Sequence, residues 1–221
     1  MKTFLIISSF IVTFLSCKPE YKECEFSIKD EELLIYNEIL NELVEHHFYS
    51  GYLGDEADTI FRKYDYFKDT AEIKKAIIKL QNKVFMDTSR FCALLLDTGN
   101  FYLSIDSVKT YRPEIIKIIK TISPDEATST DRLNSIQEQY IGKDFQLCTS
   151  RVLSYDELKK KQKCYIGKLK LSKLIINNEK TKGLLYYEFI CGGKCGMGEL
   201  VEIEKIDKRW RIKNTHQFWI S

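Results

Sequence analysis

Residues 200–220 read LVEIEKIDKRWRIKNTHQFWI, and the prediction of the fold starts from this segment. Two runs of alternating apolar and charged residues flank Asp207 and Lys208, a pattern typical of two half-buried strands joined by a two-residue loop. The opposed pairs are then Ile203 with Ile212, Glu204 with Arg211, and Glu202 with Lys213. Each pair contributes about 0.2–1 kcal/mol, and a slip of one residue would lose all three, so the sequence predicts a hairpin in this register.

Two more strands are expected upstream of this hairpin. Residues 168–171 alternate with a period of two and continue into 174–176, and residues 184–191 form a further apolar run. Two amphipathic helices precede them, one from Asp30 that stops by Gly51 and one that starts with the capping pattern of Asp69 and Glu72. The expected fold class is therefore α+β, with N-terminal amphipathic helices followed by a C-terminal four-stranded antiparallel meander.

The middle of the chain, residues 91–154, is expected to contain a hairpin, short helices and a linker. Residues 91–96 and 101–105 flank the turn-like residues 97–100 and favour a hairpin, with a helix through 92–96 as the alternative. Pro113 suits the first turn of a helix over 115–122. Residues 123–131 are polar and contain Pro124, so they are expected to link a helix-rich part, 27–122, to an α+β part, 132–221, unless 27–221 is one compact domain. Short helices are expected before Gly142 and after Ser154.

The first 17 residues form a separate pattern. Lys2 is followed by an apolar run from Phe4 to Leu15, which is too short to span a bilayer, and Cys17 ends it before a charged segment. This layout resembles a bacterial lipoprotein signal peptide. Such peptides usually have leucine three residues before the cysteine and a small residue two before it, where this chain has Phe14 and Leu15. An ordinary secretory signal or a buried apolar strand are the alternatives.

The resemblance implies that residues 1–16 are removed, that membrane lipid is attached through Cys17, and that 17–26 form a flexible tether. Two or three acyl chains anchor a protein durably, so we expect a location at the cell envelope. The residue after Cys17 is Lys18, whereas an Asp at this position would resemble an inner-membrane retention signal. The outer membrane is therefore expected, and periplasmic or surface exposure stays open.

Charge argues against a nucleic-acid partner. The chain has 34 basic and 32 acidic residues, whereas nucleic-acid binders carry a strong basic excess on one face. The basic run at 159–163 follows two acids and is read as a solvated helix face.

A second resemblance covers about the last 55 residues. The string from Cys191 to Gly198, CGGKCGMG, together with the ending Trp219-Ile220-Ser221, is similar to the C-terminal signature of small uncharacterised bacterial envelope proteins. The resemblance implies a shared sheet module and carries over no catalytic residue. We read the glycines as a wide hairpin loop, because a phosphate-binding loop would lead into a helix.

Six cysteines remain after Cys17. Six cysteines can form 15 complete sets of disulfides, and their spacing alone does not choose among these sets. Cys191 and Cys195 are the candidate disulfide, and a zinc site formed by them with His216 is the less favoured reading. No catalytic residue, cofactor or metal is indicated, because the chain has no Gly-x-Ser-x-Gly or His-Glu-x-x-His motif.

Two functional hypotheses follow. The first is a membrane-anchored binding or assembly module whose partner is an envelope protein, a peptide or a glycan. The alternative is a thiol-dependent redox or hydrolytic enzyme that uses Cys191 or Cys195, which would require a thiolate of lowered pKa.

Overall fold

A computed structural model describes residues 26–48, 53, 55–65, 68–86, 92–159, 164–193 and 195–221. The leader, Cys17 and most of the tether lie outside these residues, as does most of the basic run at 159–163. The helices are α1 (Glu31–Glu42), continued by the π-helix η1 (Leu43–His47), α3 (Asp55–Lys63), α4 (Thr70–Met86), α5 (Ile105–Tyr111), α6 (Glu114–Ile122), α7 (Glu126–Asn134) and the 3₁₀ turns η2 (Gly142–Asp144) and η3 (Glu157–Lys159). The strands are β1 (Cys92–Leu96), β2 (Ser150–Leu153), β3 (Tyr165–Leu171), β4 (Ile175–Ile176), β5 (Lys182–Gly192), β6 (Cys195–Ile206) and β7 (Arg209–Ile220).

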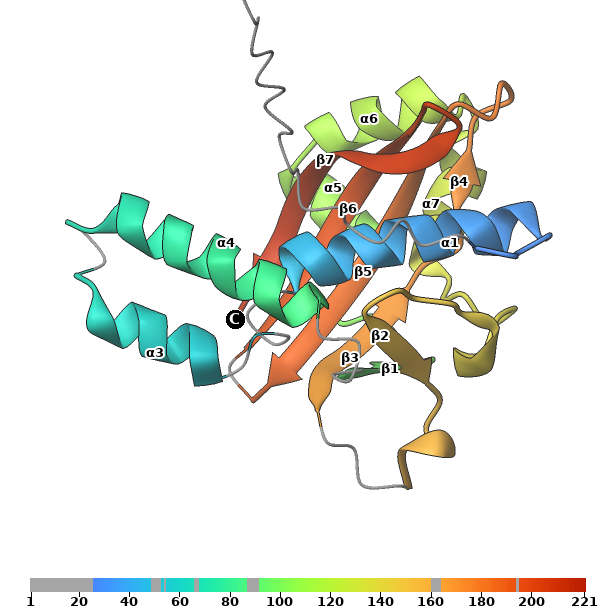
Figure 1. The fold of residues 1–221 in the computed structure, drawn as a ribbon. Coiled ribbons are helices and arrows are strands. Elements are labelled where there is room, and N and C mark those ends of the chain that lie inside the picture. Colours follow the sequence, from blue (N-terminus) through green and yellow to red (C-terminus); the bar gives the residue numbers. More distant parts are fainter. Residues whose placement is uncertain are drawn as a thin grey trace, which may run out of the picture.

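The described strands form one mixed sheet, and the α+β class is confirmed. Its order is β2-β1-β3-β5-β6-β7, with β4 paired to β5 (Figure 1). The path β3-β5-β6-β7 is antiparallel, as the expected meander requires, but β1 pairs in parallel with both β2 and β3. The sheet therefore includes strands from both sides of the expected linker, and the meander is only part of it.

The β6–β7 hairpin has the predicted two-residue loop. Asp207 and Lys208 both have positive φ, 49° and 67°, as the tight turn of a two-residue hairpin loop requires. The pairs Ile203–Ile212 and Glu204–Arg211 are as expected, but Glu202 lies opposite Asn214. A bulge at this point gives β7 one extra residue, Lys213, so the third predicted pair was wrong.

The hairpin expected around residues 97–100 was wrong, and so was the alternative helix through 92–96. Residues 92–96 do form a strand, but the chain after it turns into α5, because the Ser104 side chain accepts a hydrogen bond from the backbone N–H of Ser107 and caps that helix. A buried five-residue run cannot by itself distinguish a hairpin partner from a central parallel strand.

The linker expected at 123–131 is mostly the first part of α7. Asp125 caps this helix by accepting from the backbone N–H of Thr128, and Leu133 anchors it in the core. The helix expected over 133–142 ends at Asn134 instead, and Ile136 forms an isolated bridge with Ser172. A polar surface helix with few apolar residues resembles a linker in sequence because its cap, rather than an apolar period, defines it.

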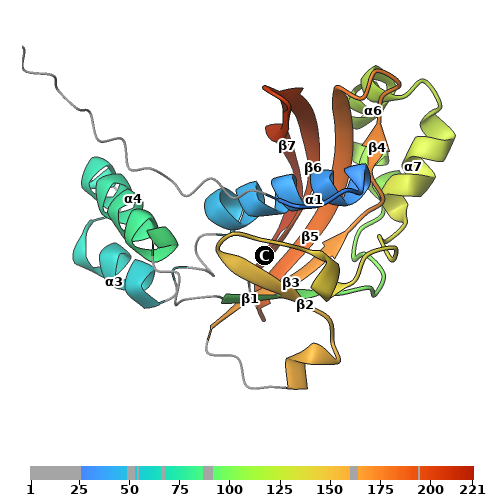
Figure 2. The same ribbon diagram turned by 45° about the vertical axis from the view of Figure 1, so that its right-hand side comes forward.

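Two layers of helix enclose the sheet (Figure 2). α1 covers one face, where Tyr36, Leu40 and Leu43 join Leu185 and Val201 of the sheet in the larger core. On the other face α5, α6 and α7 pack over a smaller core. Its buried residues are Ile105, Val108, Ile115, Ile119, Ile122, Leu133, Ile175, Leu184, Tyr186 and Leu200. α3, which was not predicted, forms a hairpin with α4 that projects from the body (Figures 1 and 2).

Polar side chains of α1 tie other segments to the body. Glu38 and Glu42 accept hydrogen bonds from the backbone N–H groups of Trp210 and Ile212, at 2.7 and 3.1 Å. These groups lie on the outer edge of β7, so the two carboxylates satisfy donors that an exposed edge strand would otherwise leave open.

Among the described residues, no helix is both long enough and apolar enough to cross a membrane.

Candidate functional site

A hollow of about 510 Å³ lies where the first turn of α1, the start of α7 and strand β4 meet. We call it the α1–α7 groove. Its volume falls in the range of about 300–1,000 Å³ that is common for small-molecule sites. Its lining residues are Asp30, Glu31, Glu32, Ile35, Ser123, Thr128, Ser129, Arg132, Leu174, Ile175, Ile176, Lys180 and Trp210.

The acidic wall of the groove comes from the first turn of α1. Asp30 caps the helix: its Oδ1 accepts from the backbone N–H of Leu33 at 2.9 Å and from the Tyr140 hydroxyl at 2.8 Å. These hydrogen bonds, that of Leu33 first, lower the pKa of Asp30. Glu31 is exposed and forms an ion pair with Lys180 at 2.6 Å. Both carboxylates therefore have protein partners.

Glu32 differs from its two neighbours. Its side chain is half-buried, and within the described part of the chain it has no hydrogen bond and no ion pair. Burial raises the pKa of this carboxyl, and the nearby Asp30 adds to the rise, while the charge of Arg132 opposes it. A half-buried acid without a partner destabilises the fold when it is ionised, so its presence at the groove calls for an explanation.

Arg132 provides the basic wall. Its Nε donates to the backbone carbonyl of Leu174 at 2.9 Å, which fixes the guanidinium plane. Within the described chain the two terminal nitrogens have no hydrogen bond or ion pair, so the guanidinium retains donors for an anion. Ser123, Thr128 and Ser129 line the groove as well, and the Thr128 hydroxyl donates to the Asp125 carboxylate.

The floor is apolar and held in place. Ile35, Leu174 and Trp210 are 3%, 1% and 2% exposed. The hydroxyl of Tyr36 donates to the carbonyl of Ser172 at 2.8 Å and accepts from the backbone N–H of Leu174 at 3.1 Å, so β4 and the segment before it are tied to α1. The groove is thus a preformed apolar floor between an acidic and a basic wall.

Glu32→Gln is expected to stabilise the protein at neutral pH. Because the pKa of Glu32 is raised in the folded state, the folded protein binds the proton more tightly, and the cost of ionising Glu32 appears as pH rises through its folded pKa. The variant should therefore unfold at higher urea than the wild type at pH 7, and the difference should vanish as pH falls below about 4, the ordinary range of the carboxyl. An equal or lower midpoint at pH 7 would show that Glu32 has a stabilising partner.

Comparisons of this chain with protein-family models, curated proteins and solved structures found no match.

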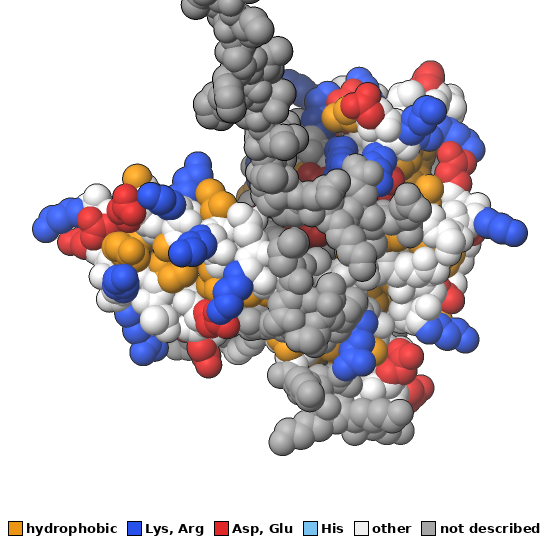
Figure 3. All heavy atoms as spheres, viewed as in Figure 1, with side chains coloured by type: hydrophobic (Ala, Val, Ile, Leu, Met, Phe, Trp, Pro, Cys, Tyr) orange, Lys and Arg blue, Asp and Glu red, His pale blue; other side chains and the backbone are white. Residues whose placement is uncertain are grey.

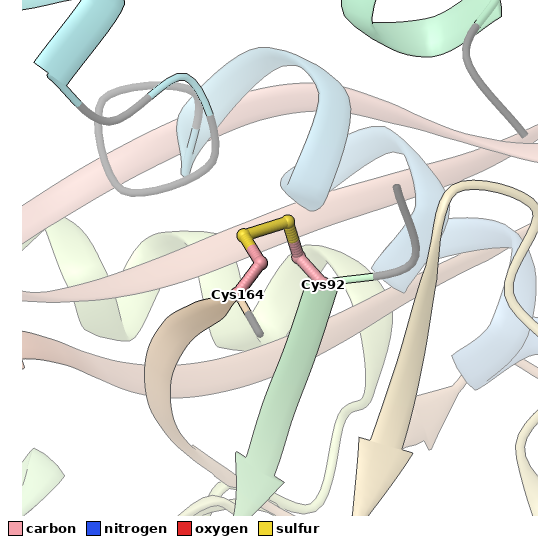
Figure 4. The surroundings of a disulfide bond; sticks show 2 residues. All are labelled: Cys92 and Cys164. Atoms are coloured by element: carbon pink, nitrogen blue, oxygen red, sulfur yellow. A yellow bond between two sulfur atoms is a disulfide. The ribbon is translucent and has the colours of Figure 1, made fainter. Parts of the chain in front are cut away.

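The cysteines take the following positions. Cys191 and Cys195, the candidate disulfide, are bonded to each other at the β5–β6 turn with their Cα atoms 5.2 Å apart. Cys92 at the start of β1 is bonded to Cys164 just before β3 (Figure 4). Cys148 is disulfide-bonded as well. With both sulfurs bonded, neither Cys191 nor Cys195 is a thiolate nucleophile in this state.

His216, the third residue of the less favoured zinc reading, lies beside Glu202, with Nε2 2.6 Å from its carboxylate. Across the described residues, no group of three or more His, Cys, Asp or Glu side chains has the arrangement of a metal site.

The glycine-rich signature does not form a wide loop. Gly196 and Gly198 lie within β6 against the Trp219 indole, and a Cβ at Gly198 would overlap the indole nitrogen. Ser221 pairs with Gly196 through two backbone hydrogen bonds. The residues that carry the resemblance thus converge on one end of the sheet, where Gly196 and Gly198 provide room for an aromatic ring while Gly193 lies in the turn.

A buried ion pair lies beside Trp219. Glu188 is 0% exposed, and its carboxylate accepts from Lys170, from the Tyr186 hydroxyl, and from the backbone N–H groups of Tyr102 and Leu103. These contacts fix the loop between β1 and α5 to the sheet. We assign the pair a structural role, because all its groups are satisfied within the fold.

Sequence reasoning did not find the groove residues. They come from four segments, near residues 30–35, 123–132, 174–180 and 210, which only the fold brings together. The one local signal was Asp30 at the start of an amphipathic helix, and it indicated a cap rather than a site.

Proposed function

We propose that this protein is a membrane-anchored lipoprotein of the cell envelope that acts as a binding module, with the α1–α7 groove as its binding site. The anchor is Cys17, whose thiol carries diacylglycerol and which becomes the first residue when residues 1–16 are removed, and the short tether that follows holds the body beside the bilayer. The outer membrane is the preferred location, with periplasmic or surface exposure left open.

The binding part of the proposal depends on the groove. An unpaired half-buried carboxylate faces an arginine with free donors across a preformed apolar floor, and such a convergence is the usual mark of a small-molecule site. Its lining, within the described residues, includes no Cys and no His, the commonest thiol nucleophile and general base, which favours binding over catalysis.

The disulfides support the envelope location. Disulfides persist in oxidising compartments such as the bacterial periplasm and are rare in the cytosol. Two bonds, Cys92–Cys164 and Cys191–Cys195, lie in the described chain, and Cys148 is also bonded. The mixture of basic and acidic side chains on the visible face argues against a nucleic-acid partner (Figure 3).

Cys17→Ser is expected to release the protein from membranes. After expression in a bacterial host and alkaline washing, the wild type should sediment with the membrane fraction, while the variant should stay in the supernatant or remain unprocessed, because acyl chains on Cys17 supply the membrane affinity. Lys22→Ser, which changes a residue of the same expected tether and keeps every cysteine, is the matched control and should sediment like the wild type. If the wild type is soluble after processing, the leader is an ordinary secretory signal and the anchor is wrong.

A further inference from the structure

We propose that the α1–α7 groove binds a short peptide by its two charged ends, with the ammonium group at Glu32 and Asp30 and the carboxylate group at Arg132. This inference rests on the binding role proposed above and adds the chemical class of the ligand.

The acidic wall is suited to one cation. Glu32 has no partner within the described structure, and Asp30, which accepts hydrogen bonds from Leu33 and Tyr140, lies two positions before it at the start of the same helix. Lys180, the cation at this end of the groove, is already paired with Glu31. An ammonium group has three donors, so one group can satisfy both carboxylates, and binding would replace the missing partner of Glu32.

The basic wall is suited to one planar anion. The Nε–carbonyl bond to Leu174 orients Arg132, and its remaining N–H groups form a fork that matches a carboxylate through two parallel hydrogen bonds. Ser123 and Ser129 lie on the same wall and can supply hydroxyl donors to the same group, whereas the Thr128 hydroxyl already donates to Asp125.

The two walls do not neutralise each other. Arg132 is near enough to influence the titration of Glu32, yet in the described structure no ion pair joins them. The space between them is about 510 Å³ over a floor that includes Ile35, Leu174 and Trp210, which suits the backbone and one apolar side chain of a short peptide. A neutral glycan would bury the same acid and guanidinium without giving either a charged partner.

The test is calorimetric titration of the detergent-solubilised full chain with L-alanyl-L-leucine, its N-acetyl derivative and its C-terminal amide. Acetylation removes the ammonium charge and amidation removes the carboxylate. We expect each change to weaken binding to the wild type by about ten-fold or more, since each removes a charge-assisted contact. In Glu32→Gln, acetylation should have little further effect, and in Arg132→Ala, amidation should have little further effect.

Glu114→Gln is the matched control, because Glu114 lies in the first turn of α6 and pairs with Arg112 away from the groove. It should respond to both derivatives like the wild type. Unfolding midpoints of all variants show that the fold is kept.

Three results would overturn the inference: no heat of binding for the unmodified dipeptide at millimolar concentration, equal losses on acetylation in wild type and Glu32→Gln, or tighter binding of cellotetraose than of the dipeptide. The first two would leave the lipid anchor untouched, because Cys17 is tested separately. If the processed wild type binds the dipeptide but carries no acyl group, the peptide inference holds and the proposed lipid anchor is wrong.

Discussion

Replacing Glu188 with alanine is expected to lower the free energy of unfolding by about 3–5 kcal/mol, the range for breaking a buried ion pair by removing one partner. Lys170, whose side chain is 5% exposed, would lose its carboxylate partner in the core. Its ammonium also lies 4.0 Å from the centre of the Tyr102 ring, and the backbone N–H groups of Tyr102 and Leu103 would lose their shared acceptor. The loop between β1 and α5 would therefore detach from the sheet.

Urea unfolding at pH 7 measures this loss. The matched control is Glu204→Ala, which removes a carboxylate from the same sheet, where Glu204 pairs with Lys213 at 2.9 Å in a solvent-exposed position. That change should leave the urea midpoint almost unaltered, because water and salt screen an exposed ion pair. The double variant Lys170→Met with Glu188→Gln should recover much of the loss, because an amide oxygen still accepts from the loop and no buried charge remains. Similar losses for Glu188→Ala and Glu204→Ala would mean that the buried pair contributes no more than a surface pair.

Removing the Cys92–Cys164 disulfide is expected to destabilise the protein by about 4 kcal/mol in the chain-entropy account. The two residues are 72 positions apart, so the bond restricts a long loop in the unfolded chain. Cys92 is also 0% exposed, at the start of a strand in the middle of the sheet. Urea unfolding of the double variant Cys92→Ala, Cys164→Ala against the wild type checks the value.

The Cys191–Cys195 bond provides the comparison within the same molecule. It closes a loop with a separation of only 4, for which the same relation gives about 2 kcal/mol. The corresponding double alanine variant should therefore lose about half as much. An equal or larger loss at Cys191–Cys195 would contradict the loop-entropy explanation for this chain.

The sequence was sufficient to predict elements whose determinants are local. The β6–β7 hairpin follows from a two-residue loop with complementary pairs on both sides, and α1 and α4 follow from apolar periods with capping residues. The register error at Glu202 has a physical reason: a bulge admits Lys213 as an extra residue, and no composition rule marks that position. Asn214 then lies where Lys213 was expected.

Elements with long-range determinants were missed. β1 pairs in parallel with β2 and β3, which lie more than fifty residues further along the chain, and its apolar residues carry no information about their partners. The groove was missed for the same reason, because Glu32 and Arg132 are a hundred positions apart. Cys191 and Cys195 were recognised as a candidate pair because they are close in sequence.

Intact-mass analysis of the processed protein from a bacterial host tests the lipoprotein account most directly. The account predicts a polypeptide that starts at residue 17, heavier than its amino-acid mass by diacylglycerol with or without a further acyl chain. A processed chain with another first residue, or with no added lipid mass, would contradict it.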